Sequence, residues 1–522
     1  MTDINIPELL ERLPARISDV VAPWAERLPD HPALVEASGK WTYRELASAI
    51  SETKDWLAKS GVRPGDRVMI VCENCRAFVG LLLATASLDA WPVLVNARLS
   101  APEVDKIQEH SGARIVFYTT AVSPHAAAHA RRMGASAQNV GSLGPIAVGR
   151  INEGAVLEVN EEGTAHNVGA LIYTSGTTGL PKGVMLSHRG LLFVGAVAAT
   201  MRTIIPEDRV YGILPTSHAV GLSVVLLGSL WSGATLYLAP RFDPVRALAT
   251  FETERITLLL GGPSMFSMLL DYAKLKGMRS VHYPSLRIIT SSGAPLQPAI
   301  KSAVEGFFGM VLHNGYGVTE CSPNIASTRG ETPRSDDSVG KIFPGVEVRL
   351  VGSDGKAVAS GEVGELWVRG PNVMKGYYRA PEETAAAINP DGWFNTRDLA
   401  RMNGDHLFIV GRTKELIVRF GLNVYPAEVE AVLNSHPAVV RAAVLGRTVE
   451  GVEGGEEVVA FVQVSPASTL TREELAEHAA GHLAPYKRPT QIEFVESMPV
   501  TLTGKVMKDE LAKTMALGSP AR

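Results

Sequence analysis

Residues 173–183 decide how this chain is interpreted, and they read YTSGTTGLPKG. The apolar segment 169–172 directly before them predicts a buried β-strand. Two glycines, Gly176 and Gly179, let the chain turn tightly so that backbone N–H groups point inward. Hydroxyl side chains and one lysine add further donors, which is how a loop cradles a polyphosphate. The candidate phosphate contacts are Thr174, Ser175, Gly176, Thr177, Thr178 and Lys182.

The loop is not a Walker A loop. The Walker pattern GxxxxGK, followed by Ser or Thr, requires a second glycine five positions after Gly176, where Pro181 stands. An ordinary P-loop nucleotidase is therefore disfavoured. A surface loop rich in Gly, Ser and Thr is the bland alternative, but such loops rarely carry this ordered string.

Outward from this loop, short β-branched runs such as 67–72 alternate with helical patterns such as 43–60, which predicts parallel α/β units. From about Ser338 the pattern changes to strands joined by glycine turns, so we expect a β-rich subdomain. After Gly411 and Arg412 a smaller α+β unit begins. The predicted fold is α/β, with a large N-terminal domain at 1–411 and a small mobile C-terminal domain at 412–522.

Several further segments accompany the loop, and they read LPTSHAVGL at 214–222, SGAPL at 292–296, YGVTE at 316–320, GWFNTRDL at 392–399, GRTKE at 411–415, NVYPAEVE at 423–430 and TGK at 503–505. Together with residues 173–183 they resemble, in order, the adenylate-forming superfamily. That family contains acyl-CoA and aryl-CoA synthetases, peptide-synthetase adenylation domains and beetle luciferases. The resemblance covers about Ile17 to Leu511. It implies ATP, Mg²⁺ and coenzyme A as cofactor and co-substrates.

The resemblance implies roles around the nucleotide. Glu320 matches the magnesium-binding glutamate, and Thr319 beside it can donate to the α-phosphate. Asp398 matches the ribose-binding carboxylate, supported by Arg412. The family usually has glycine before this aspartate, where Arg397 stands here. Tyr316 would stack on adenine in a slot that draws on Ser292, Gly293, Ala294, Pro295, Asn314, Gly315 and Gly317.

The resemblance also implies roles in the C-terminal unit. Lys505 matches the catalytic lysine, with Lys508 where an arginine is frequent. Lys414 matches the hinge about which the small domain swings. The CoA tunnel would be lined by Gly421, Leu422 and Asn423. Phe420 stands where many relatives have glycine, which makes this wall bulkier.

An acyl pocket is implied at nine positions, and the matching residues carry no full charge apart from a histidine. They are His218, Ala219, Val220, Gly221, Gly261, Gly262, Ser291, Gly315 and Val318. His218 would gate the pocket or orient the carboxylate. None of these positions carries a lysine or arginine that could pair with a second carboxylate of the substrate. None carries an aspartate or glutamate that could pair with an α-ammonium group. We therefore expect a neutral aryl acid or a medium-chain fatty acid.

The main reading is an AMP-forming acid:CoA ligase. A stand-alone adenylation enzyme that loads a carrier protein is an alternative, and it would form the adenylate without a CoA thioester. A luciferase-like oxidoreductase would consume O₂. A non-catalytic binding protein is disfavoured by the joint presence of Lys505, Glu320 and the phosphate loop.

Composition restricts the partners. The net charge is −4, which gives no reason to expect nucleic acid or an anionic membrane. Three cysteines exclude a disulfide framework and favour a cytoplasmic location, and Cys72 and Cys75 are expected to be buried packing residues. No signal peptide or membrane span is expected. The sequence leaves the oligomeric state open.

Overall fold

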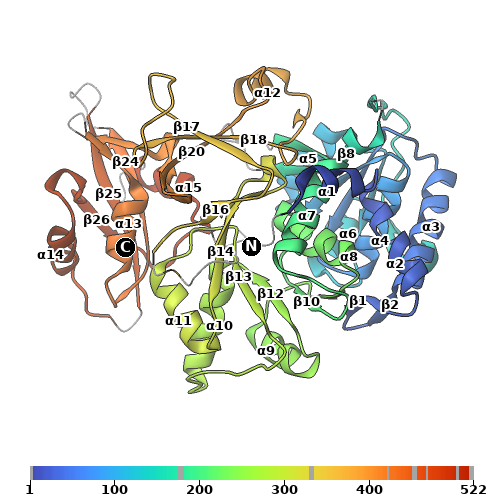
Figure 1. Cartoon of the computed structure of the whole chain (residues 1–522), viewed down its shortest axis with the longest axis horizontal. Helices are drawn as coiled ribbons and strands as arrows, with labels where there is room; N and C mark the ends of the chain where they lie inside the picture. Colours follow the sequence, from blue (N-terminus) through green and yellow to red (C-terminus); the bar gives the residue numbers. More distant parts are fainter. Residues whose placement is uncertain are drawn as a thin grey trace.

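The computed structural model describes residues 4–161, 163–174, 182–328, 334, 336–419, 422–448, 455–465, 468–500 and 505–516. Its strands form sheets of eight, thirteen, two and three strands. In Figure 1 the small C-terminal unit lies at one end of the molecule and the N-terminal sheet lies at the other. None of the helices in these ranges combines the length and the hydrophobicity needed to cross a membrane.

The eight-stranded sheet contains the strands on either side of the predicted phosphate loop. Its order is β19-β9-β8-β4-β3-β5-β7-β6. The central strands are parallel and fully buried, as the continuous apolar runs predict. The strands are β3 (Arg67–Cys72), β4 (Trp91–Asn96), β5 (Ile115–Tyr118), β6 (Ser136–Asn139), β7 (Pro145–Val148), β8 (Val168–Thr174), β9 (Lys182–Ser187) and β19 (Gly376–Tyr377).

The thirteen-stranded sheet begins as a parallel sheet and ends as an antiparallel one. The parallel part is β1 (Pro32–Glu36), β11 (Thr235–Leu238), β10 (Arg209–Gly212), β12 (Leu258–Gly261), β13 (Ile288–Ser291) and β14 (Leu312–Gly317). The antiparallel part is β15 (Asn324–Ser327), β16 (Gly340–Ile342), β21 (His406–Arg412), β20 (Phe394–Asn403), β18 (Val363–Arg369) and β17 (Glu347–Val351), and β2 (Gly39–Thr42) closes the other edge. The expected β-rich subdomain is confirmed, and β14–β15 pairing joins it to the parallel strands.

Helices cover the parallel strands of both sheets. The parallel part of the larger sheet packs on α9 (Pro244–Thr253), α10 (Pro263–Leu275) and α11 (Pro298–Phe308). The helices of the N-terminal region include α3 (Tyr43–Lys59), α4 (Arg76–Ser87), α5 (Ala101–Ser111), α6 (Pro124–Arg132) and α7 (His188–Met201). Cys72 and Cys75 are free and buried, as expected.

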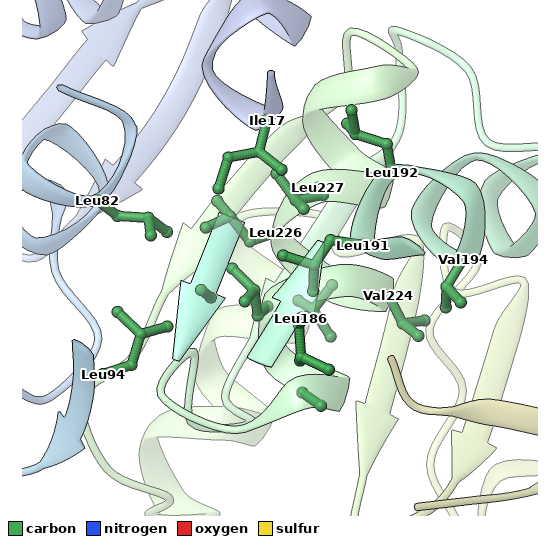
Figure 2. Packing of buried hydrophobic residues seen from close by; sticks show 14 of the residues in the cluster. Ile17, Leu82, Leu94, Leu186, Leu191, Leu192, Val194, Val224, Leu226 and Leu227 are labelled. Carbon is green, nitrogen blue, oxygen red and sulfur yellow. The ribbon is translucent and has the colours of Figure 1, made fainter. Parts of the chain in front are cut away.

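The largest core packs α7 against a π-helical segment, Val220–Leu227. Figure 2 shows Leu191, Leu192 and Val194 of α7 beside Val224, Leu226 and Leu227 of that segment. The two backbones approach closely. A Cβ at Gly195 would lie only 2.9 Å from the carbonyl oxygen of Ser223, so this position favours glycine. This core fixes the segment that follows directly after His218.

The C-terminal unit has its own core and its own sheet. Its elements are the hairpin β22 (Ile417–Arg419) and β23 (Leu422–Val424), α13 (Pro426–Asn434), β24 (Val439–Thr448), β25 (Glu456–Val464), α14 (Arg472–His482), β26 (Gln491–Phe494) and α15 (Lys508–Ala516). Buried Val429, Leu433, Val444 and Leu475 hold the helices on the sheet. The α+β prediction for this unit is confirmed.

Candidate active site

The carboxyl ends of three parallel strands meet where the nucleotide slot was predicted. Register pairs Gly261 with Ser291 and Ser291 with Asn314, so β12 and β13 end beside Asn314, while β14 continues to Gly317. This edge of an open α/β sheet is where ligands bind. The Ser292 N–H donates to the Gly261 carbonyl at 3.0 Å, and its hydroxyl donates to the Gly315 carbonyl at 3.3 Å. The predicted slot residues are therefore brought together.

Two slot residues have backbone or side-chain duties of their own. Gly293, followed by Ala294 and Pro295, adopts a φ of +91°, a conformation that favours glycine. Asn314 is buried, and its side-chain amide donates to the Ser338 carbonyl at 3.4 Å. Its backbone N–H donates to Thr328 Oγ1 at 2.7 Å. The side chain of Asn314 therefore connects the strand that borders the predicted slot to the backbone at Ser338.

Asp398, the predicted ribose carboxylate, is held from two sides. Tyr316 donates to its Oδ2 at 2.5 Å, and Arg412 Nε lies 2.9 Å from its Oδ1. Asp398 and Arg412 are also cross-strand partners on β20 and β21. Burial raises the pKa of the Tyr316 phenol, and the neighbouring Asp398 raises it further, so the hydroxyl stays a donor. Sequence reasoning placed the three residues correctly in one site, but it missed the Tyr316–Asp398 bond.

Arg397, the departure from the family pattern, occupies a left-handed backbone conformation with φ of +60°. Glycine adopts this region freely, whereas other residues do so at a cost. The Arg397 N–H donates to Asn395 Oδ1 at 2.9 Å, and its guanidinium reaches the Ala386 carbonyl at 3.5 Å. These contacts hold an arginine where the backbone favours glycine.

The predicted phosphate loop lies between two antiparallel strands, β8 and β9. Thr174 at the end of β8 pairs with Lys182 at the start of β9. The predicted contacts Ser175, Gly176, Thr177 and Thr178 lie outside the described residues. The Lys182 ammonium lies 5.1 Å from the centroid of the Tyr377 ring on β19.

Glu320 contacts the same tyrosine as Lys182 does, and it lies in the short 3₁₀ turn Thr319–Cys321. It accepts a 3.0 Å hydrogen bond from the Tyr377 hydroxyl at Oε1, and burial raises the pKa of its carboxyl. In the described part of the chain, no group of three or more His, Cys, Asp or Glu side chains is suited to hold a metal. A single carboxylate fits a magnesium ion that is held mainly by ATP phosphates and water.

Lys505 directly precedes Val506, which forms a bridge with Val500; residues 501–504 lie outside the described ranges. Its ammonium interacts electrostatically with Arg412, Asp398 and Glu415. Burial lowers the pKa of Lys505, and Arg412 lowers it further. The predicted catalytic lysine is therefore within electrostatic range of Asp398 and Arg412.

Lys508 stands between two carboxylates, an arrangement that sequence reasoning missed. Its ammonium is 2.8 Å from Glu415 and 2.8 Å from Glu430 on α13. Burial disfavours its charge, but Glu430 and Glu415 outweigh burial and raise the pKa of Lys508. Lys508 therefore joins the turn Thr413–Glu415 to α13.

The predicted hinge residue and two of the predicted CoA residues lie at the start of the small unit. Lys414 is exposed in the turn Thr413–Glu415 between β21 and β22. Leu422 and Asn423 are exposed on β23 and pair with Arg419 and Val418. Gly421 and Phe420 lie outside the described residues. Among the described residues, Leu422 and Asn423 make no hydrogen bond to Tyr316, Asp398 or Arg412.

His218 precedes the π-helical segment and is half-buried. Its N–H donates to the Pro215 carbonyl at 3.0 Å, while Nε2 is shielded from solvent and has no partner among the described residues. Burial lowers the pKa of His218, so the ring is neutral at pH 7. Gly221 is needed here, because a Cβ would lie 2.1 Å from the Pro215 carbonyl oxygen.

The other predicted pocket positions are small or apolar in the structure. Ser291 Oγ is buried and has no hydrogen-bond partner in the described chain. Gly262 begins α10, and Ala219 is buried at the start of the π-helical segment, followed by half-buried Val220. Val318 packs partly on the main core, and a Cβ at Gly315 would have no neighbour within 3.7 Å.

The chain matches the family model of the AMP-binding enzymes over residues 21–378. It also matches the model of the AMP-binding enzyme C-terminal domain over residues 428–505. The chain therefore belongs to the AMP-binding enzyme family. Within that family it is a ligase of the AMP-forming acid–thiol type.

Similar proteins cover nearly the whole chain. A feruloyl-CoA synthase of an Amycolatopsis species is 34% identical over 93% of this chain and 96% of its own length. The 4-coumarate–CoA ligase 5 of Oryza sativa subsp. japonica is 33% identical over 89% of this chain and 88% of its own. The crystal structure of ATP-bound MatB from Rhodopseudomonas palustris is 30% identical, has a TM-score of 0.81 and covers 95% of this chain and 98% of its own.

Proposed function

We propose that this enzyme activates a neutral carboxylic acid as its acyl-adenylate and then transfers the acyl group to the thiol of coenzyme A. The observation that carries the proposal is the meeting of Tyr316, Asp398, Arg412 and Lys505 at the carboxyl end of β14. A ribose-binding carboxylate and a lysine from the small unit share one place. That is the arrangement an adenylation step needs.

In the first half-reaction a carboxylate oxygen attacks the α-phosphorus of ATP, and the bond to pyrophosphate breaks. Asp398 would accept the ribose hydroxyls, and Lys505 would stabilise the charge that develops at the α-phosphate. Thr319 would donate to the same phosphate. Magnesium, when bound with ATP, neutralises phosphate charge, and Glu320 would be its protein ligand.

In the second half-reaction the thiolate of CoA attacks the acyl carbonyl, and AMP leaves. No enzyme nucleophile is required, because a thiol with a pKa of ~8.5 supplies enough thiolate. The small domain would swing about Lys414, with the domain boundary between 411 and 412. Gly421, Leu422 and Asn423 would then line the CoA tunnel.

The acid would be an aryl acid in preference to a medium-chain one. The pocket positions carry no full charge, and a neutral His218 at the mouth fits an uncharged acyl group. A second carboxylate or an ammonium would be buried there without a counter-charge, at a heavy desolvation cost. The feruloyl-CoA and 4-coumarate–CoA enzymes that resemble this chain support the aryl choice.

The test is a panel of acids with ATP, Mg²⁺ and CoA, read out as AMP release and as thioester mass. Ferulate, 4-coumarate and benzoate should give the highest kcat/KM, octanoate less, and malonate and phenylalanine almost none. AMP release without a thioester would instead support loading of a carrier protein. Acid-dependent O₂ uptake would support the luciferase-like alternative. Malonate or phenylalanine in first place would overturn the pocket assignment.

A further inference from the structure

Tyr377 joins two parts of the nucleotide site that lie far apart in the sequence. Its hydroxyl donates to Glu320 Oε1 at 3.0 Å. Its ring lies under the Lys182 ammonium, which is 5.1 Å from the ring centroid. One side chain thus touches both the candidate metal ligand and the lysine that ends the phosphate loop.

The backbone fixes Tyr377 from several directions. It pairs with Val184 of β9, and its N–H donates to Thr384 Oγ1 at 2.9 Å. Gly376 before it has a φ of +138°, and a Cβ there would lie 2.6 Å from Thr384 Cγ2, so only glycine fits. The same segment reaches Glu320 a second time, through the Met374 N–H at 2.7 Å from the Glu320 carbonyl. The position of the ring is therefore fixed by contacts within the chain itself.

We propose that Tyr377 is a positioning residue for the magnesium–ATP complex. Its hydroxyl occupies Oε1 of Glu320 and leaves Oε2 for the metal, while its ring steadies Lys182 beside the phosphates by a cation–π contact. This rests on the roles given above to Glu320 and Lys182. The two contacts use different parts of the side chain, so they can be separated by substitution.

The experiment compares Tyr377→Phe with Tyr377→Leu. Two readouts are used: thermal stabilisation by a non-hydrolysable ATP analogue during a Mg²⁺ titration, and acid-dependent ATP–pyrophosphate exchange. Tyr377→Phe loses only the bond to a charged acceptor, so its Mg²⁺ half-saturation should rise roughly tenfold. Saturating Mg²⁺ should restore both kcat and analogue affinity. Tyr377→Leu also loses the ring, so its analogue affinity should stay roughly threefold lower at saturating Mg²⁺.

Tyr378→Phe is the matched control. The Tyr378 hydroxyl donates to Glu158 at 2.5 Å, so this variant loses a tyrosine–carboxylate bond one residue away and leaves Glu320 alone. Its Mg²⁺ half-saturation should equal that of the wild type. The inference is overturned if Tyr377→Phe leaves the Mg²⁺ half-saturation unchanged, or if Tyr378→Phe shifts it equally. A wild type without exchange activity would instead count against the proposed function, and analogue binding would still test Tyr377.

Discussion

The hydroxyl of Tyr316 donates a 2.5 Å hydrogen bond to Oδ2 of Asp398, an aspartate whose side chain is only 4% exposed. Arg412 approaches the other oxygen at 2.9 Å. Together these two contacts set the direction of the carboxylate before a nucleotide arrives. Tyr316 therefore contacts the predicted ribose carboxylate, in addition to its predicted stacking on adenine.

Tyr316→Phe should therefore raise the KM for ATP. The variant keeps the ring for stacking and loses a bond to a charged acceptor, which is worth about 1.5–3 kcal/mol, or roughly tenfold and more in affinity. The kcat of pyrophosphate exchange at saturating ATP should change much less. An unchanged KM would mean that the Tyr316 hydroxyl does not orient Asp398.

Arg397→Gly should stabilise the protein. The residue has a φ of +60°, where a non-glycine side chain costs about 1 kcal/mol or more. Relief of this strain should raise the free energy of unfolding by up to about 1 kcal/mol, measured by chemical denaturation. Arg401→Gly on the same strand is the control, and it should lower stability by about 0.5–1 kcal/mol, because glycine weakens an ordinary strand position. A loss of stability in Arg397→Gly would show that its side-chain contacts outweigh the backbone strain.

Lys508→Met should loosen the small domain. Lys508 is 18% exposed and pairs with two carboxylates, so its removal leaves Glu415 and Glu430 without the cation that joins them. The expected loss of stability is roughly 1–3 kcal/mol, together with slower adenylation, because Lys505 stands three residues before it. Lys513→Met on the same helix breaks an exposed pair with Glu510 and should change neither quantity. Equal behaviour of the two variants would exclude a special role for Lys508.

Gly315→Ala should narrow the acyl pocket without disturbing the fold. The nearest atom to a new Cβ is Ser292 Oγ at 3.7 Å, an ordinary contact distance. The kcat/KM for ferulate should fall relative to that for benzoate, while the unfolding midpoint stays near wild type. Gly221→Ala is the contrast, because its Cβ would meet the Pro215 carbonyl at 2.1 Å and should cost roughly 1–3 kcal/mol of stability. Unchanged selectivity in Gly315→Ala would show that Gly315 does not line the acyl pocket.

The sequence predicted most elements because their signals are local. The apolar run 67–72 became β3 with its predicted limits, and the helix predicted at 43–60 became α3 (Tyr43–Lys59), whose start is capped by Thr42 and Glu45. The ordered motifs also placed Tyr316, Asp398, Arg412 and Lys505 in one site. Each of these residues lies in a short motif that can be recognised from the sequence alone.

What the sequence could not predict depends on contacts between distant segments. Tyr377 meets Glu320 across 57 positions and Lys508 meets Glu415 across 93, and neither pair has a local pattern. The left-handed backbone of Arg397 was hinted at only by the glycine usual in the family. The join of the β-rich strands to the parallel sheet through β14–β15 follows from tertiary pairing, which periodicity does not encode.

The two half-reactions of Lys505→Ala test the central claim most directly. Lys505 lies beside Asp398 and Arg412 in the present arrangement, so its loss should slow acid-dependent ATP–pyrophosphate exchange by ~10²–10³-fold. Thioester formation from a supplied feruloyl-adenylate and CoA should stay within a few-fold of the wild type, because the proposed second step does not use the lysine. Equal losses in both half-reactions, or exchange at the wild-type rate, would contradict the account.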